Sequence, residues 1–293
     1  MATLVTIVTG EEREQVKRFA NDAVDCAIAE GCLDKDSIQV LIGNGDEFLA
    51  RIIAGIKELS VSNLFADEEV KSSYYAYPKD YEVKRIAEQV CILRQLFPGI
   101  GYADEKLAEE PLPLNAEGWF AIPRWQTIAP TYNQAVAKVL AMIKSERRFY
   151  NNYEDLLGAM SLRQHGKKAE MFRKLGDEQK NHDILVVPAQ FGFRHRGRSV
   201  RRAREVFLAN EFGLGVYEIG IMLLTHPERE ARWEQLHIVC AGDEFTLSVS
   251  GGFVHAPSFF CRHSMIKFGV TWFGNAKGGY GSASAFLPAE ASV

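Results

Sequence analysis

The side chains best suited to chemistry in this chain are six arginines that lie close together in the sequence. The stretch from residue 194 to residue 204 holds all six and contains no acidic residue. Guanidinium groups grip phosphate through paired hydrogen bonds, so a dense set of them is typical of a site for a polyanion. The predicted binding residues are Arg194, His195, Arg196, Arg198, Ser199, Arg201, Arg202 and Arg204.

The surroundings of this arginine segment favour an anion site. The apolar run at residues 184–188 predicts a buried strand, and residues 199–210 predict a helix with Ser199 as its N-cap. A loop that leads into a helix offers backbone N–H groups and the positive end of the helix dipole. Phe191, Phe193 and His195 are suited to stacking on bases. We therefore expect nucleic acid or a phosphorylated ligand to bind here, unless the arginines are solvated or pair with the protein's own carboxylates.

Three carboxylates support a second hypothesis, a metal-dependent phosphoester hydrolase. Asp243 and Glu244 follow an apolar strand, and Asp183 precedes the strand at residues 184–188. Carboxylates at strand ends often bind divalent ions, although a turn or hairpin edge is the more common reason for a Gly242-Asp243-Glu244 sequence. The sequence leaves open whether the chain is an enzyme and which cofactor it would use. We predict no zinc site, because His237 and Cys240 would face opposite sides of a strand.

Charge is distributed unevenly along the chain and suggests a third hypothesis. Residues 1–120 hold 12 Lys and Arg against 22 Asp and Glu, whereas residues 121–204 hold 17 against 7. The last 89 residues hold 5 against 9, which gives the whole chain a net charge of −4. A structural or assembly protein could pair the acidic region of one copy with the basic region of another, which would make a homo-oligomer. Most basic residues between 144 and 174 are expected on solvated helix faces.

Hydrophobic periodicity predicts that the first part of the chain is mostly helical. Residues 11–30, 46–59 and 81–96 each carry apolar residues at helical spacing. Residues 36–42 form a short helix or strand. Residues 98–118 contain three prolines, five acids and one lysine and are the best linker candidate. We therefore predict an acidic helical region at residues 1–117.

The second part, residues 118–293, is expected to combine helices with a sheet. Strands are predicted at 118–123 and 184–188, and helices at 131–144, 167–181 and 217–225. An alternating pattern at residues 235–274 predicts an antiparallel meander of three or four strands, with a hairpin turn at Gly251 and Gly252. The glycine-rich segment 278–285 looks flexible. The predicted fold class is α+β, a helical N-terminal part followed by an antiparallel meander sheet with packed helices.

Composition favours a cytoplasmic protein without a membrane segment. Apolar residues make up 47% and charged residues 25%, as in ordinary globular proteins. The longest apolar stretch, residues 212–224, is too short to cross a bilayer and contains Glu218. Five scattered cysteines are typical of reduced thiols rather than of a disulfide framework.

Overall fold

The computed structural model describes residues 9–60, 63–72, 75–79, 81–154, 157–158, 160–230, 232–248 and 251–288. The chain divides into two units, Met1–Ser62 and Asn63–Val293. The first unit contains helices α1 (Gly10–Ala29), α2 (Lys35–Gly43) and α3 (Gly45–Ser60). Thr9 and Glu12 form a capping box at the start of α1, and Asp34 caps α2. No described side chain in these three helices is buried.

The division after Ser62 lies upstream of the boundary after Glu117 that the linker candidate at residues 98–118 suggested. The segment between these points belongs with the strands because it bonds to them and to their neighbours. The side-chain amide of Gln89, for example, donates to the carbonyl of Trp119 at 2.8 Å. Glu68 likewise accepts hydrogen bonds from residues far along the chain, as described below. The acidic region predicted at residues 1–117 therefore spans the first unit and the beginning of the second.

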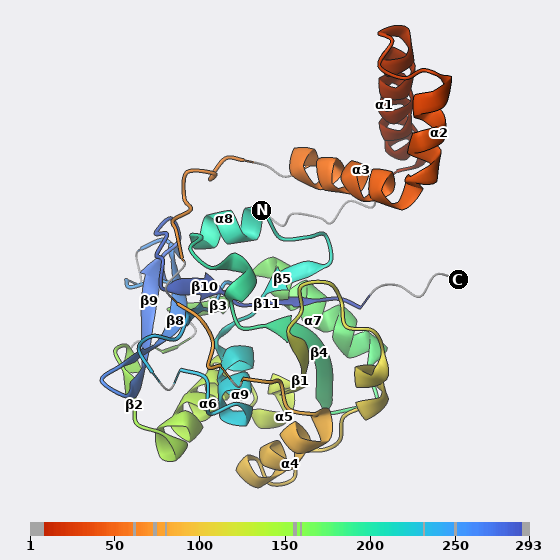
Figure 1. Cartoon of the computed structure of the whole chain (residues 1–293). Coiled ribbons are helices and arrows are strands. Elements are labelled where there is room, and N and C mark those ends of the chain that lie inside the picture. The colour runs from red at the N-terminus through yellow and green to blue at the C-terminus, as the bar shows by residue number, and fades with distance from the viewer. Residues whose placement is uncertain are drawn as a thin grey trace. The chain divides into compact units, whose positions relative to one another are not determined.

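The second unit is an α+β fold built from two sheets and six α-helices among its described residues (Figure 1). One sheet has the order β1 (Gly118–Pro123), β4 (Ile184–Gln190), β11 (Ser284–Phe286) and β5 (Glu211–Gly213). The helices are α4 (Ile86–Leu96), α5 (Trp125–Ile128), α6 (Tyr132–Glu146), α7 (Gly166–Glu178), α8 (Val200–Glu205) and α9 (Val216–Thr225). Two short 3-10 helices are η1 (Glu105–Glu109) and η3 (Phe193–His195).

The core of this unit lies around β4 and α9. Every residue of β4 is buried, as the apolar run predicted, and the strand pairs antiparallel with β1 over six residues. Helix α9 is buried along its whole length and packs against α6 and β1. A helix that is buried on every side must pack against other elements on every side, as α9 does.

The second sheet has the order β10 (Tyr280–Ser282), β6 (His237–Val239), β8 (His255–Arg262), β7 (Asp243–Phe245) and β3 (Leu162–Gln164). Strand β9 (Met265–Trp272) pairs with β8, and β2 (Phe149–Asn151) pairs with β9. The β8–β9 hairpin turns at His263 and Ser264, whose φ angles of 52° and 54° are left-handed. Two consecutive residues with positive φ are typical of a tight hairpin turn.

Several predicted elements differ from the observed ones. Residues 235–274 do contain four strands, but β6 lies beside β8 rather than beside β7. Part of the predicted hairpin at Gly251 falls on residues 249–250, which lie outside the described residues, and β7 and β8 pair only at Phe245 and His255. The segment 278–285 is not a loose tail, because β10 and β11 join the two sheets. Strand β11 lies between β4 and β5, and its small residues fit this buried position.

Two predicted helices are shorter than their sequence pattern. Helix α4 begins at Ile86 rather than at Tyr81, and α8 ends at Glu205 rather than at Asn210. Residues 81–85 are extended because their backbone bonds to neighbouring elements instead of forming a first helical turn. Within the described part of the chain, no helix combines the length and the apolar character that a bilayer span requires.

Candidate functional site

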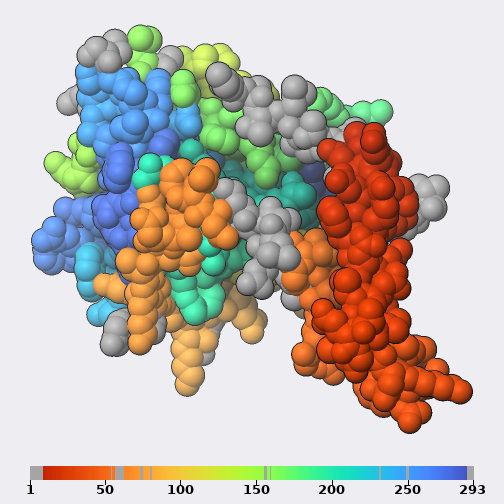
Figure 2. Space-filling view, turned by 90° about the horizontal axis from the view of Figure 1, so that it is seen from above, coloured from red at the N-terminus to blue at the C-terminus, as the bar shows by residue number. Residues whose placement is uncertain are grey.

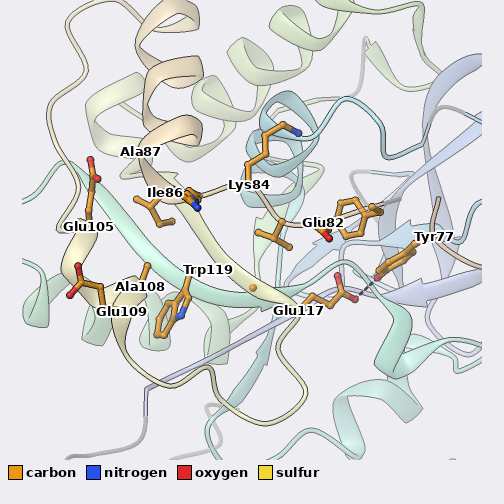
Figure 3. Close-up of a pocket in the computed structure, with 14 residues that line it drawn as sticks. Tyr77, Glu82, Lys84, Ile86, Ala87, Glu105, Ala108, Glu109, Glu117 and Trp119 are labelled. Atoms are coloured by element: carbon orange, nitrogen blue, oxygen red, sulfur yellow. Dashed lines mark hydrogen bonds between the residues drawn. The ribbon is translucent and has the colours of Figure 1, made fainter. Parts of the chain in front are cut away.

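A pocket of about 870 Å³ lies beside the extended segment 81–85 (Figure 3). The start of α4, η1 and the start of β1 complete its walls. Figure 3 shows Glu117 and Tyr77 at one end of the pocket and Glu105 and Glu109 at the other, with Trp119 between them. The charged lining residues are Glu82, Lys84, Arg85, Glu105, Glu109 and Glu117.

Buried polar side chains fix the wall formed by residues 81–85. The amide of Gln89, which is fully buried, donates to the carbonyls of Lys84 at 2.7 Å and Trp119 at 2.8 Å. The backbone N–H of Lys84 donates to Nε2 of His226 at 3.1 Å. Burial lowers the pKa of His226 to about 4, so its imidazole is neutral and can accept this bond. These contacts connect the segment to β1 and to the end of α9.

Gly118 allows the segment to approach β1 closely. A Cβ atom at this position would lie 2.6 Å from Cβ of Val83, which is closer than real side chains come. Only glycine therefore lets residues 81–85 pack on the first residue of β1. This contact brings Glu117, the residue before Gly118, to the floor of the pocket.

Glu117 is held by one side chain and one backbone group. The hydroxyl of Tyr77 donates to Oε1 of Glu117 at 2.5 Å, and the N–H of Phe191 donates to Oε2 at 3.1 Å. The Tyr77 oxygen in turn accepts from the N–H of Phe193 at 3.1 Å. Both carboxyl oxygens thus have defined donors, and the group cannot turn without losing one of them.

Burial changes the acidity of this carboxyl. Removal from water raises the pKa of Glu117 to about 7, although the Tyr77 and Phe191 hydrogen bonds and the positive charge of Arg229 oppose the shift. Burial also raises the pKa of Tyr77 well above its usual value, so Tyr77 stays a donor. A carboxyl that titrates near neutral pH beside a pocket is a candidate functional group.

Arg229 supplies a buried positive charge behind the pocket. Its side chain is fully buried, and its guanidinium carbon lies 3.9 Å from the centre of the Tyr77 ring. Nη2 donates to the carbonyl of Leu236 at 3.2 Å, whereas Nε has no hydrogen-bond partner among the described residues. The hydroxyl of Tyr81, which lines the pocket, also bonds to no described residue. The site therefore keeps unused hydrogen-bonding capacity.

The lining of the pocket has an excess of negative charge. Four of its charged residues are glutamates, whereas two are basic. One of the two, Lys84, already pairs with Glu228 at 2.9 Å, and Glu228 does not line the pocket. Carboxylates thus dominate the charge that a ligand would meet.

The predicted arginine segment is largely neutralised by the protein's own acids. Arg201 bonds to Glu68, and both Arg198 and Arg202 pair with Glu69 at 3.3 and 2.6 Å. Of the six arginines, only Arg196 has no carboxylate partner among the described residues, and it stacks on Phe193. Ser199 caps α8 as predicted and also donates to Glu68. Further pairs join Arg194 to Glu211 at 3.1 Å, Arg202 to Glu205 at 3.0 Å and Arg204 to Glu244 at 3.5 Å.

The glutamates that pair with α8 come from an extended segment at residues 63–72. In Figure 2 this segment, in orange, lies on the surface next to the teal α8 region. The N–H of Val70 donates to the carbonyl of Gly197 at 2.8 Å, and the N–H of Ser199 donates to the carbonyl of Glu68 at 3.0 Å. Backbone and side-chain bonds together cover the face of α8 that was predicted to bind a polyanion. Binding of a polyanion at this face stays a prediction. That prediction assumed uncovered arginines, whereas Arg198, Arg201 and Arg202 pair with the protein's own glutamates.

His195 lies inside the protein rather than at a binding surface. It is fully buried, and its Nε2 lies 2.7 Å from Oε1 of Glu211. Burial alone would raise the pKa of Glu211, but bonds from His195, Ser284 and Arg194 lower it to about 2. This network joins η3 to β5 and β11, which indicates a structural role.

The three carboxylates considered for a metal site do not converge. Oδ1 of Asp243 accepts from Lys168 at 2.9 Å, and Oδ2 accepts from the hydroxyl of Tyr132 at 2.6 Å. Glu244 pairs with Arg163 and Arg204, and Asp183 is exposed at the head of β4. Nowhere in the described ranges do three or more His, Cys, Asp or Glu side chains group so that they could hold a metal ion.

The residues that define the pocket were not singled out from the sequence. Glu117 fell within the linker candidate, although an acid directly before a predicted strand could have drawn attention to it. Lys168 was grouped with solvated basic residues, yet it is 1% exposed and pairs with Asp243 and Glu218. Nothing in local spacing indicates that Arg229 stacks on Tyr77, because the two are distant in sequence.

Comparison of the chain with known proteins found no match. No model of a known protein family matches the chain, and neither do curated proteins or solved structures. The assignment of function therefore depends on the geometry of the Asn63–Val293 unit itself.

Proposed function

We propose that the Asn63–Val293 unit binds a small cationic ligand, such as an aliphatic amine, in the pocket beside Glu117. The observation that carries the proposal is a half-buried carboxyl with a raised pKa of about 7 at the floor of a carboxylate-rich pocket. An ammonium group beside Glu117 would favour its ionised form. Binding would then release a proton from the fraction of molecules in which Glu117 is protonated.

The aromatic lining supports the same class of ligand. Tyr77, Tyr81 and Trp119 line the pocket, and the faces of aromatic rings attract cations. The unpartnered hydroxyl of Tyr81 can accept a hydrogen bond from an ammonium N–H. A pocket of this volume suits a small molecule.

A carboxyl that exchanges a proton near neutral pH also suits general acid–base catalysis. The proposal thus extends to a reaction of the bound amine in which Glu117 takes up or returns a proton. Ligand binding can be tested before any reaction is known.

The test compares 1,4-diaminobutane with its neutral analogue 1,4-butanediol by isothermal titration calorimetry. We expect the diamine to bind more tightly than the diol, with an affinity that rises by up to about tenfold between pH 6 and pH 8 as Glu117 ionises. Glu117→Gln should weaken binding and remove the pH dependence. Glu88→Gln, an exposed change on α4 that does not line the pocket, is the matched control. Equal binding of diamine and diol, or no binding of either, would refute the proposal.

A further inference from the structure

A second pocket, of about 370 Å³, lies between α5, α7 and the first turn of α9. It shares no lining residue with the pocket beside Glu117. We call it the α7–α9 pocket. The lining residues that matter here are Trp125, Gln126, Gln164, Phe172, Tyr217 and Glu218.

Tyr217, one of the lining residues, carries a polar group without a described partner. The side chain is 1% exposed, and its buried hydroxyl has no hydrogen-bond partner among the described residues. An unsatisfied buried hydroxyl destabilises the folded protein, so such groups in native proteins call for an explanation. A bound molecule with a complementary donor or acceptor would satisfy it.

The charges around the α7–α9 pocket are already in use. The guanidinium of Arg124 donates to three backbone carbonyls, those of His182, Gly176 and Gln179, each at 2.8 Å. Arg173 pairs with Asp177 at 3.0 Å.

On the remaining side, Glu218 pairs with Lys168 at 2.8 Å and also accepts the N–H of Gly215 at 2.9 Å. Each charged group in the wall therefore has a partner within the protein. A charged ligand would have to break one of these pairs, whereas an uncharged one would not.

Neutral groups remain available for recognition. The side-chain amides of Gln126 and Gln164 make no hydrogen bond to other described residues, and each offers both a donor and an acceptor. Trp125 and Phe172 add aromatic surface, on which flat rings stack favourably. Tyr217 adds a hydroxyl that can donate or accept.

We propose that the α7–α9 pocket binds a small, uncharged, planar heterocycle of the nucleobase type. The aromatic walls contact its faces, and the Tyr217 hydroxyl and the glutamine amides bond to its polar edge. The volume matches a single heterocycle or nucleoside rather than a polymer. This site is independent of the amine pocket, so either proposal can fail without the other.

The experiment uses the full chain and three probes: adenine, uracil and the apolar ring toluene. Binding is followed by calorimetry and by quenching of tryptophan fluorescence. We expect adenine or uracil to bind and toluene not to bind, with a quenching signal that is lost in Trp125→Phe. Tyr217→Phe keeps the ring and removes only the unpartnered hydroxyl, so it should not lower the melting temperature, and it should weaken base binding about tenfold.

Thr271→Val provides the matched control. It also removes a buried hydroxyl that has no partner among the described residues, but Thr271 does not line the pocket. Its base affinity should equal that of the unchanged protein. The proposal is overturned if neither base binds, if toluene binds as tightly as the bases, or if Tyr217→Phe binds the bases with undiminished affinity.

Discussion

The hydroxyl of Tyr77 lies 2.5 Å from Oε1 of Glu117 and donates a hydrogen bond to it. This bond joins the segment before α4 to the residue before β1, which are 40 positions apart in the sequence. It also opposes the effect of burial on the carboxyl. The relationship makes several outcomes predictable.

Tyr77→Phe should destabilise the protein and raise the pKa of Glu117 further. The change removes the donor to Glu117 and the acceptor for the N–H of Phe193, so we expect the free energy of unfolding to fall by about 1–3 kcal/mol. Urea denaturation measures this. Tyr81→Phe removes a hydroxyl without a described partner and should not lower stability. Similar losses in both variants would contradict the role given to the Tyr77 bond.

Stability should fall as the pH rises from about 4.5 to about 7 because of Glu117. Its pKa in the folded state is raised, so the folded protein binds this proton more tightly than the unfolded chain does. Ionisation of the buried carboxyl removes at most about 3 kcal/mol over that window. Glu117→Gln cannot ionise and should flatten this part of the profile. Unfolding curves at several pH values, for both proteins, test the difference; parallel profiles would argue against a raised pKa.

Lys168→Met should be strongly destabilising. The ammonium group lies between Asp243 and Glu218, at 2.9 and 2.8 Å, and its removal leaves two buried carboxylates without their cation. Breaking a buried ion pair by removing one partner typically costs about 3–5 kcal/mol. Arg173→Met breaks an exposed pair with Asp177 on the same helix and should cost less than about 0.5 kcal/mol. Denaturant titration of the two variants gives the comparison, and equal effects would rule out a special role for the buried network.

Replacement of both Glu68 and Glu69 by Gln tests the predicted polyanion site. The double variant removes the carboxylates that pair with Arg198, Arg201 and Arg202. If these arginines can bind a polyanion, the variant should bind heparin with an affinity that falls steeply with salt, and the unchanged protein should bind it far less. Glu88→Gln, a single exposed change, controls for lost negative charge. If the double variant folds but does not bind heparin, the role of the arginine segment is structural only.

Local patterns predicted the elements better than their arrangement. The α+β class is confirmed, and the apolar run at 184–188 is the buried strand β4 because continuous apolar residues suit a strand covered on both faces. The positions of β10 and β11 could not be read from a glycine- and serine-rich segment. Small residues there reflect close packing: a Cβ on Gly281 would lie 2.1 Å from the carbonyl oxygen of Gly192.

The site could not be predicted because its parts are joined by long-range contacts. The arginine segment was visible as a charge cluster, but its partners Glu68 and Glu69 are about 130 positions away. Likewise, the acidity of Glu117 depends on burial beneath residues 81–85 and on Arg229. Such long-range contacts leave no periodic signal in the sequence. The Ser199 cap depends only on residues next to it in the chain, and its prediction is confirmed.

The place of β11 between β4 and β5 has a consequence for how the protein is made. Strand β5 pairs only with β11 among the described strands, yet 70 residues separate them in the chain. During synthesis the backbone groups of β5 that bond to β11 therefore stay unpaired until residue 286 has emerged from the ribosome. A nascent chain stalled before that point would expose an open edge of β4, which is where we expect chaperones to engage it.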